Sequence, residues 1–123
     1  MIYESVIETL NLVSKSDQHS FKTMKWMIHI IEDDVDILNI LNIFFQRKGF
    51  KVIADYNGND LDLKHEPCPE VYLIDINLVG KNGMDICKRI KNECKNIPVV
   101  LMSANTQLEN MAKECHADAF ISK

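Results

Sequence analysis

The sequence predicts an α/β domain in which a five-stranded parallel sheet carries helices on both faces. Strand-like and helix-like patterns alternate five times along the chain, which is the order of consecutive right-handed βαβ units. The strand-like stretches are apolar throughout, as expected when both faces of a parallel sheet are covered. A chain of 123 residues suffices for one such domain with a sizeable core.

Composition excludes several classes of protein. Hydrophobic residues make up 46% and charged residues 26%, the balance of a soluble globular protein rather than a disordered one. The formal charge is −4 and no basic stripe is visible, so we expect no direct nucleic-acid binding. No apolar run reaches the roughly 18 residues of a membrane span, and the N-terminus lacks a signal peptide's apolar region. The four cysteines form no CxxC pair, which favours reduced thiols and a cytoplasmic location.

The N-terminal 24 residues are expected to stand apart from the main domain, residues 25–123. Apolar side chains recur there at helical spacing, which predicts an amphipathic helix over residues 2–13. Its apolar stripe consists of Ile2, Val6, Leu10 and Val13. Residues 14–22 are polar and contain serines, and we interpret them as a linker.

The first strand and helix of the main domain are expected within residues 25–50. An apolar run that ends in acidic residues predicts a buried strand over 25–34. Residues 35–50 follow with a helical stripe, and Gly49 marks its end. Asp34 is expected to cap this helix. The side chains expected to face the core are Ile37, Ile40, Leu41, Phe44 and Phe45.

The other elements follow in alternation. Further strands are expected over residues 50–56, 70–75, 97–104 and 117–123. A weak, short helix is expected over 58–66 and a stronger one over 83–94. The stronger helix should turn inward Ile86, Cys87, Ile90 and Cys94. The last helix is marked by Leu108, Met111, Ala112 and Cys115. The four histidines show no spacing that suggests a metal site or a phosphorelay, so none is given a role.

Polar side chains stand at the ends of four predicted strands. The first strand ends at Glu32 and Asp33, the third at Asp75, the fourth at Ser103 and the fifth at Lys123. Sites in such folds lie beyond the carboxyl ends of the strands, where neighbouring strands are about 4.8 Å apart. We therefore expect acids, a hydroxyl and an ammonium to converge at one edge of the sheet.

This combination of groups suits a metal and a phosphoryl group. Carboxylates about 4 Å apart repel by roughly 4 kcal/mol at an effective dielectric constant near 20, so they need a cation or a shared proton. Oxygen ligands with room for water favour Mg²⁺ over Ca²⁺. A hydroxyl and a lysine suit the oxygens of a transferring phosphoryl group, and a carboxylate can accept phosphorus as an acyl phosphate.

Four short stretches carry a resemblance to a known family. They are "IIEDD", "LIDINLVGKNG", "VVLMSA" and "AFISK", in this order and at matching spacing within residues 26–123. The sequence resembles a response-regulator receiver domain of two-component signalling, of the chemotaxis-regulator kind. The resemblance implies a flavodoxin-like, doubly wound sheet with strand order 2-1-3-4-5.

The resemblance also implies roles for single residues. Asp75 would be the phosphoacceptor. The metal, Mg²⁺ or Mn²⁺, would be held by Asp33, Asp75 and the main-chain carbonyl of Asn77, with Glu32 acting through water. The phosphate would be bound by Ser103 and Lys123. The switch residues would be Ser103 and Phe120, and Gly83 would end the loop after the phosphorylation site.

These roles imply a signalling domain rather than an enzyme acting on outside substrates. A sensor histidine kinase or phosphotransfer protein would supply the phosphoryl group, and a downstream protein partner would respond to it. The alternative is a receiver-like adaptor that is not phosphorylated and serves docking or dimerisation. A metal-dependent phosphatase would need a general acid and a substrate pocket, neither of which the sequence suggests.

Two departures from the family pattern are visible. Val79 stands where a proline is usual in the loop after Asp75. The chain also stops at Lys123, so the usual last helix is expected to be missing and to leave an apolar surface open. We expect the helix over residues 2–13 to cover it, in its own molecule or in a neighbour through a homodimer.

Overall fold

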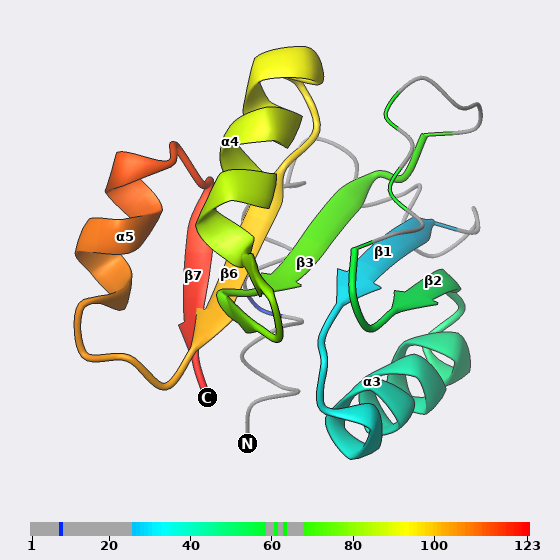
Figure 1. The fold of residues 1–123 in the computed structure, drawn as a ribbon. Helices are drawn as coiled ribbons and strands as arrows, with labels where there is room; N and C mark the ends of the chain where they lie inside the picture. Colours follow the sequence, from blue (N-terminus) through cyan, green and yellow to red (C-terminus); the bar gives the residue numbers. More distant parts are fainter. Residues whose placement is uncertain (1–7, 9–25, 59–60, 62, 64–67) are drawn as a thin grey trace.

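The structure is a computed structural model that describes residues 8, 26–58, 61, 63 and 68–123 (Figure 1). Its centre is a sheet of five parallel strands in the order β2-β1-β3-β6-β7, which confirms the predicted 2-1-3-4-5 arrangement. The strands are β1 (Met27–Ile31), β2 (Lys51–Asp55), β3 (Val71–Asp75), β6 (Val99–Ser103) and β7 (Ala119–Ser122).

Helices cover both faces of the sheet, so the predicted fold class is confirmed (Figure 1). Helix α3 (Val35–Arg47) packs on β1 and β2, and the helices on the other face pack mainly on β3, β6 and β7. These helices are α4 (Gly83–Glu93) and α5 (Leu108–Glu114). A small antiparallel hairpin in the loop after β3 is formed by β4 (Asn77–Leu78) and β5 (Lys81–Asn82).

The core forms one layer on each face of the sheet. We call the layer under α3 the α3-side core; its members are Trp26, Ile28, Ile30, Leu38, Leu41, Phe45, Phe50, Val71, Leu73, Val100, Met102 and Ile121. The layer under α4 and α5 is the α4/α5-side core; its members are Ile31, Leu63, Tyr72, Ile74, Ile76, Leu78, Met84, Cys87, Ile90, Val99, Leu101, Leu108, Ala112 and Cys115. The predicted inward faces of α4 and α5 are confirmed, with Ile86, Cys94 and Met111 partly buried at the margin.

Helix α3 begins and ends as its sequence predicts, but its buried face is rotated. The Asp34 side chain accepts hydrogen bonds from the main-chain N–H groups of Asp36 and Ile37, which confirms it as the helix cap. Gly49, with φ of +97°, lets the chain turn out of the helix. The fully covered side chains are Leu38, Leu41 and Phe45, while Ile37 and Phe44 are partly buried.

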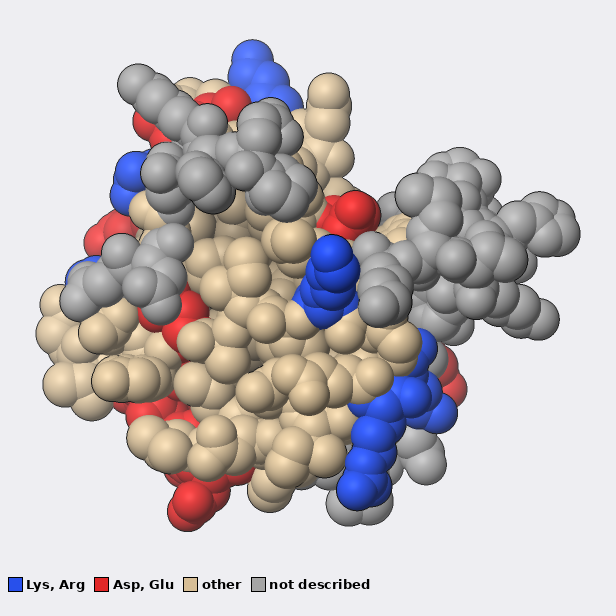
Figure 2. All heavy atoms as spheres, turned by 90° about the vertical axis from the view of Figure 1, so that its right-hand side faces the viewer, with Lys and Arg blue, Asp and Glu red and all other residues tan. Residues whose placement is uncertain are grey.

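The prediction that Ile40 faces the core is wrong, since its side chain is 46% exposed. At 100° per residue, Ile40 lies about 130° around the helix from the centre of the buried face. Together with Ile43 it lines a surface groove of about 450 Å³, bordered by Arg47 and Lys48. Figure 2 shows the side of the molecule on which β2 and α3 lie in Figure 1.

Some predictions fall on residues that the structure does not describe. They are the helix over residues 2–13, apart from Glu8, the linker over 14–22, the boundary near residue 24, and most of the helix over 58–66. Within the part of the chain that is described, no helix is long and apolar enough to cross a membrane.

Candidate functional site

The charged groups at the strand ends meet at one edge of the sheet. Lys123 follows β7 and donates hydrogen bonds to both carboxylate oxygens of Glu32, at 2.8 and 3.1 Å. Its Nζ also lies 3.0 Å from Oδ2 of Asp75, the last residue of β3. Because β6 separates β3 from β7, the lysine side chain reaches across the end of β6 to make these contacts. Glu32 is fully buried and Asp75 is 3% exposed.

Three carboxylates lie close enough together to share one cation. Glu32, Asp33 and Asp75 each offer an oxygen, and these oxygens lie within 4.8 Å of one another. A cluster made only of oxygen ligands, with one lysine against three acids, suits a hard divalent cation such as Mg²⁺. The residues present therefore fit the metal that the sequence predicts, although the Asn77 carbonyl stays a predicted ligand.

The electrostatics of Glu32 and Lys123 reflect this crowding. Burial, with the nearby Asp75 carboxylate adding to it, raises the pKa of Glu32 to about 8 despite the contact with Lys123. Burial alone would lower the pKa of Lys123, but its bonds to Glu32 and Asp75 outweigh burial and raise that pKa. The cluster thus holds more negative charge than one lysine balances.

The loop after β3 is tied to the acidic cluster by main-chain N–H groups. The N–H of Val79 donates to Oδ2 of Asp33 at 3.0 Å, and the N–H of Asn77 donates to Oδ1 of Asp75 at 3.3 Å. Proline has no N–H, so the residue usual in the family at position 79 could not make the first bond. The departure at this position therefore adds a link between the loops after β1 and β3.

Gly83 allows α4 to begin directly against the end of β3. A Cβ at this position would lie 2.2 Å from the main-chain oxygen of Asp75, which no side chain permits. The Gly83 N–H donates to the carbonyl of Ile76 at 2.8 Å, and the Asn82 side chain caps the helix by accepting from Met84 N–H. The glycine predicted from the loop pattern thus has a steric reason.

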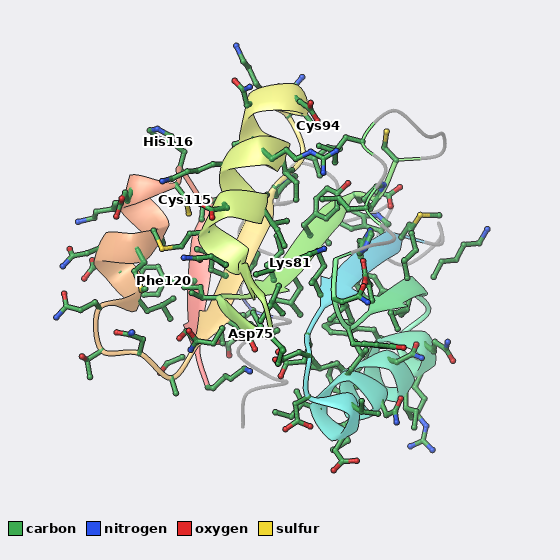
Figure 3. The ribbon with its side chains drawn as sticks, viewed as in Figure 1. Asp75, Lys81, Cys94, Cys115, His116 and Phe120 are labelled. Carbon is green, nitrogen blue, oxygen red and sulfur yellow. The ribbon has the colours of Figure 1, made fainter. Side chains whose placement is uncertain are left out.

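Among the contacts of the described residues, neither Ser103 nor Phe120 makes a hydrogen bond to the acidic cluster. Ser103 is fully buried at the end of β6, and its Oγ accepts from the Asn105 N–H at 3.0 Å. Its main-chain oxygen accepts from the Lys123 N–H, so it neighbours the lysine. Phe120 is 43% exposed on β7, on the side of α5, whereas Asp75 lies at the end of β3 (Figure 3). Their roles stay predictions.

One buried pair beside the site was missed by the sequence reasoning. His29, inside β1, places Nε2 at 3.1 Å from Oδ2 of Asp55, and both side chains are buried. Burial raises the pKa of Asp55, but hydrogen bonds from His29 and from the Asn57 and Gly58 N–H groups outweigh it and hold the pKa below its usual value. The Asp55 carbonyl also accepts from the Glu32 N–H at 3.0 Å, so the pair braces the end of β1.

Comparison of the sequence with known protein families identifies the family of this domain. A sequence model of the response regulator receiver domain matches residues 28–123. The chain belongs to this family. It is therefore a receiver domain of a two-component response regulator, a signalling domain, and the predicted resemblance is confirmed.

Solved receiver domains share its fold. The response regulator DrrB of Thermotoga maritima, an OmpR/PhoB homolog, is 28% identical with a TM-score of 0.71, over 81% of this chain and 46% of DrrB. This chain thus spans about half the length of that relative. The BeF₃-activated DrrB receiver domain is 28% identical with a TM-score of 0.70, over 81% of this chain and 86% of that one. TrrA of Thermotoga maritima, solved with Mg²⁺-BeF, shares the fold at 21% identity and a TM-score of 0.70, over 80% of this chain and 86% of TrrA.

Proposed function

We propose that this receiver domain accepts a phosphoryl group on Asp75, in the presence of Mg²⁺ or Mn²⁺, and changes a protein-interaction face in response. The donor is a phosphohistidine on a sensor histidine kinase or phosphotransfer protein. The observation that carries the proposal is the position of Asp75, whose carboxylate is nearly buried, belongs to the acidic cluster and contacts the Lys123 ammonium.

The chemistry assigned to Asp75 is an in-line transfer. A carboxylate oxygen attacks phosphorus, the O–P bond forms, and the P–N bond to the partner's histidine breaks as the imidazole leaves. Lys123, at 3.0 Å from Oδ2, offsets the negative charge that builds on the phosphoryl oxygens. Attack of water on the acyl phosphate later returns the carboxylate and releases inorganic phosphate.

The metal would be held by Asp33, Asp75 and the main-chain carbonyl of Asn77, with Glu32 acting through water. When bound, the ion would neutralise charge on the phosphoryl oxygens. The Val79 N–H keeps the Asp33 carboxylate oriented, and the Asn77 N–H does the same for Asp75. Lys123 holds Glu32 beside them.

Ser103 and Phe120 are assigned the switch. The Ser103 hydroxyl, bonded in this structure to the Asn105 N–H, would turn to a phosphoryl oxygen and pull the loop after β6 with it. Phe120, 43% exposed, would then turn inward. The surface around α5 and β7 changes shape, and a downstream protein partner reads that change. The activation of DrrB by BeF₃, a group that mimics phosphoryl, in a 28% identical receiver supports this reading.

The test is incubation of the chain with Mg²⁺ and either beryllofluoride or acetyl phosphate. We expect a 1:1 beryllofluoride complex, and a mass gain of one phosphoryl group with acetyl phosphate. Asp75→Asn should abolish both, while Asp85→Asn, which changes an exposed carboxylate on α4, should leave both intact. Absence of any adduct on the unaltered chain would contradict the proposal and favour the alternative, an adaptor that is not phosphorylated.

A further inference from the structure

We propose that residues 2–13 form an amphipathic helix that packs on the sheet of its own chain, on the α3 face, over β6 and β7. The inference is independent of the proposed phosphotransfer. It rests on a part of the α3-side core that is buried although no described element lies over it.

The buried surface in question belongs to the strands farthest from α3. Val100 and Met102 of β6 are 0% exposed, and Ile121 of β7 is 4% exposed. All three belong to the α3-side core. Helix α3, however, packs on β1 and β2, at the other side of the five-stranded sheet. Helices α4 and α5 lie on the opposite face, so among the described residues no helix covers this half.

Two stretches that lie mostly outside the described residues could supply the cover. The stretch between β2 and β3 is an unsuitable source, because its described members Leu61 and Leu63 pack with the α4/α5-side core on the other face. The other stretch is the N-terminal segment. It joins the described domain at Trp26, which is itself a member of the α3-side core and 8% exposed.

The sequence of the N-terminal segment suits this position. Its predicted stripe, with Val6 and Leu10 at its centre, would face the sheet. Glu8 lies two residues from each and so points about 200° away from them on a helix. Glu8 is the described residue of this segment, and it is helical and exposed. The nine residues of the predicted linker, 14–22, can span up to about 30 Å, so reach is no obstacle.

The groove on the outer surface of α3 is the competing docking place. It is apolar, and Arg47 and Lys48 on its border could attract glutamates of the segment. Its side chains Ile40 and Ile43 nevertheless remain 46% and 52% exposed. Because the apolar surface of β6 and β7 on the α3 face is buried and the groove on α3 is exposed, we assign the N-terminal segment to β6 and β7.

The test compares the thermal unfolding of full-length variants. Leu10→Asp places a charge in the expected interface and should lower the Tm by roughly 10 °C or more, since about 1 kcal/mol shifts the Tm of a domain this size by several degrees. Leu10→Ala gives a milder loss that can be measured if the aspartate variant does not fold. Glu8→Gln, on the exposed side, and Ile43→Asp, in the α3 groove, should stay within about 2 °C of the parent.

Two further measurements distinguish packing within one chain from packing between chains. They are the energetic coupling between two substitutions and the mass of the protein in solution. The Tm losses of Leu10→Ala and Ile121→Ala should be less than additive when combined, because the two side chains share one interface. The parent chain should be monomeric, with a Tm independent of protein concentration. A Leu10→Asp variant that melts like the parent would overturn the inference. So would a parent dimer whose Tm falls on dilution, which would assign the cover to a second copy.

Discussion

Replacing Lys123 by methionine removes the cation that contacts both Glu32 and Asp75, while most of the apolar stem of the side chain is kept. At the observed 3.0 Å, the attraction between Lys123 and Asp75 is about 5.5 kcal/mol at an effective dielectric constant of 20, before desolvation is subtracted. Loss of one partner of a buried ion pair costs about 3–5 kcal/mol.

The expected loss for this pair is smaller than that range. The Lys123 side chain is 21% exposed, and water weakens its interactions. Glu32, whose pKa is raised to about 8, is already largely protonated at neutral pH, so removal of the lysine leaves mainly the Asp75 carboxylate without its partner. We therefore expect Lys123→Met to lower the free energy of unfolding by about 2–3 kcal/mol at neutral pH without added metal.

Urea unfolding followed by circular dichroism measures this loss of stability, and repeating it with excess Mg²⁺ measures how far a cation restores it. A divalent cation bound to the acidic cluster would replace the missing positive charge, so Mg²⁺ should narrow the gap between parent and variant by about 1 kcal/mol or more. Lys113→Met, which changes an exposed lysine on α5, is the matched control and should stay within about 0.5 kcal/mol of the parent. An equal loss for the two variants, or a gap that Mg²⁺ leaves unchanged, would refute the reasoning.

Three further substitutions test the surroundings of the site. Gly83→Ala should cost about 2 kcal/mol or more in urea unfolding, because its Cβ meets the Asp75 carbonyl and the end of β3 must shift. Val79→Pro should cost about 1 kcal/mol by removing the N–H bonded to Asp33, whereas Val79→Ala, which keeps the N–H, should not. Asp55→Asn should be about 1–2 kcal/mol less stable than the parent at pH 7. Because the folded pKa of Asp55 lies below 3.8, this difference should persist above that pH and disappear as the pH falls through the folded pKa; a constant difference down to pH 2 would contradict the assignment.

The edge that holds the site could be predicted because it follows from strand order alone. Parallel strands end at one edge, so Asp75 and Lys123 had to come near each other once the alternation of strands and helices was recognised. For Lys123 the resemblance implied that it would bind the phosphate. The two bonds to Glu32 depend on side-chain geometry across four neighbouring strands, from β1 to β7, which the sequence pattern does not contain.

The features that sequence reasoning missed depend on register and rotation. His29 and Asp55 lie on the same face of the sheet because Ile31 pairs with Asp55 and His29 with Ile53, and register cannot be deduced from the separate strands. Ile40 carries an apolar side chain on a helix with apolar residues around much of its circumference. Only the packing of Leu38 and Leu41 against the sheet decides which of these side chains are buried.

The route of the Lys123 side chain across the end of β6 makes the pocket depend on the pairing of the last strand. Its acids stand at the ends of β1 and β3, whereas the lysine that balances them follows β7, 91 positions after Glu32. With β7 detached, the acids would lie together without the Lys123 ammonium, and their repulsion would be offset only by a bound cation or a proton. The charge balance of the site is in this way linked to completion of the sheet, because the Lys123 ammonium reaches Asp75 only when β7 lies beside β6.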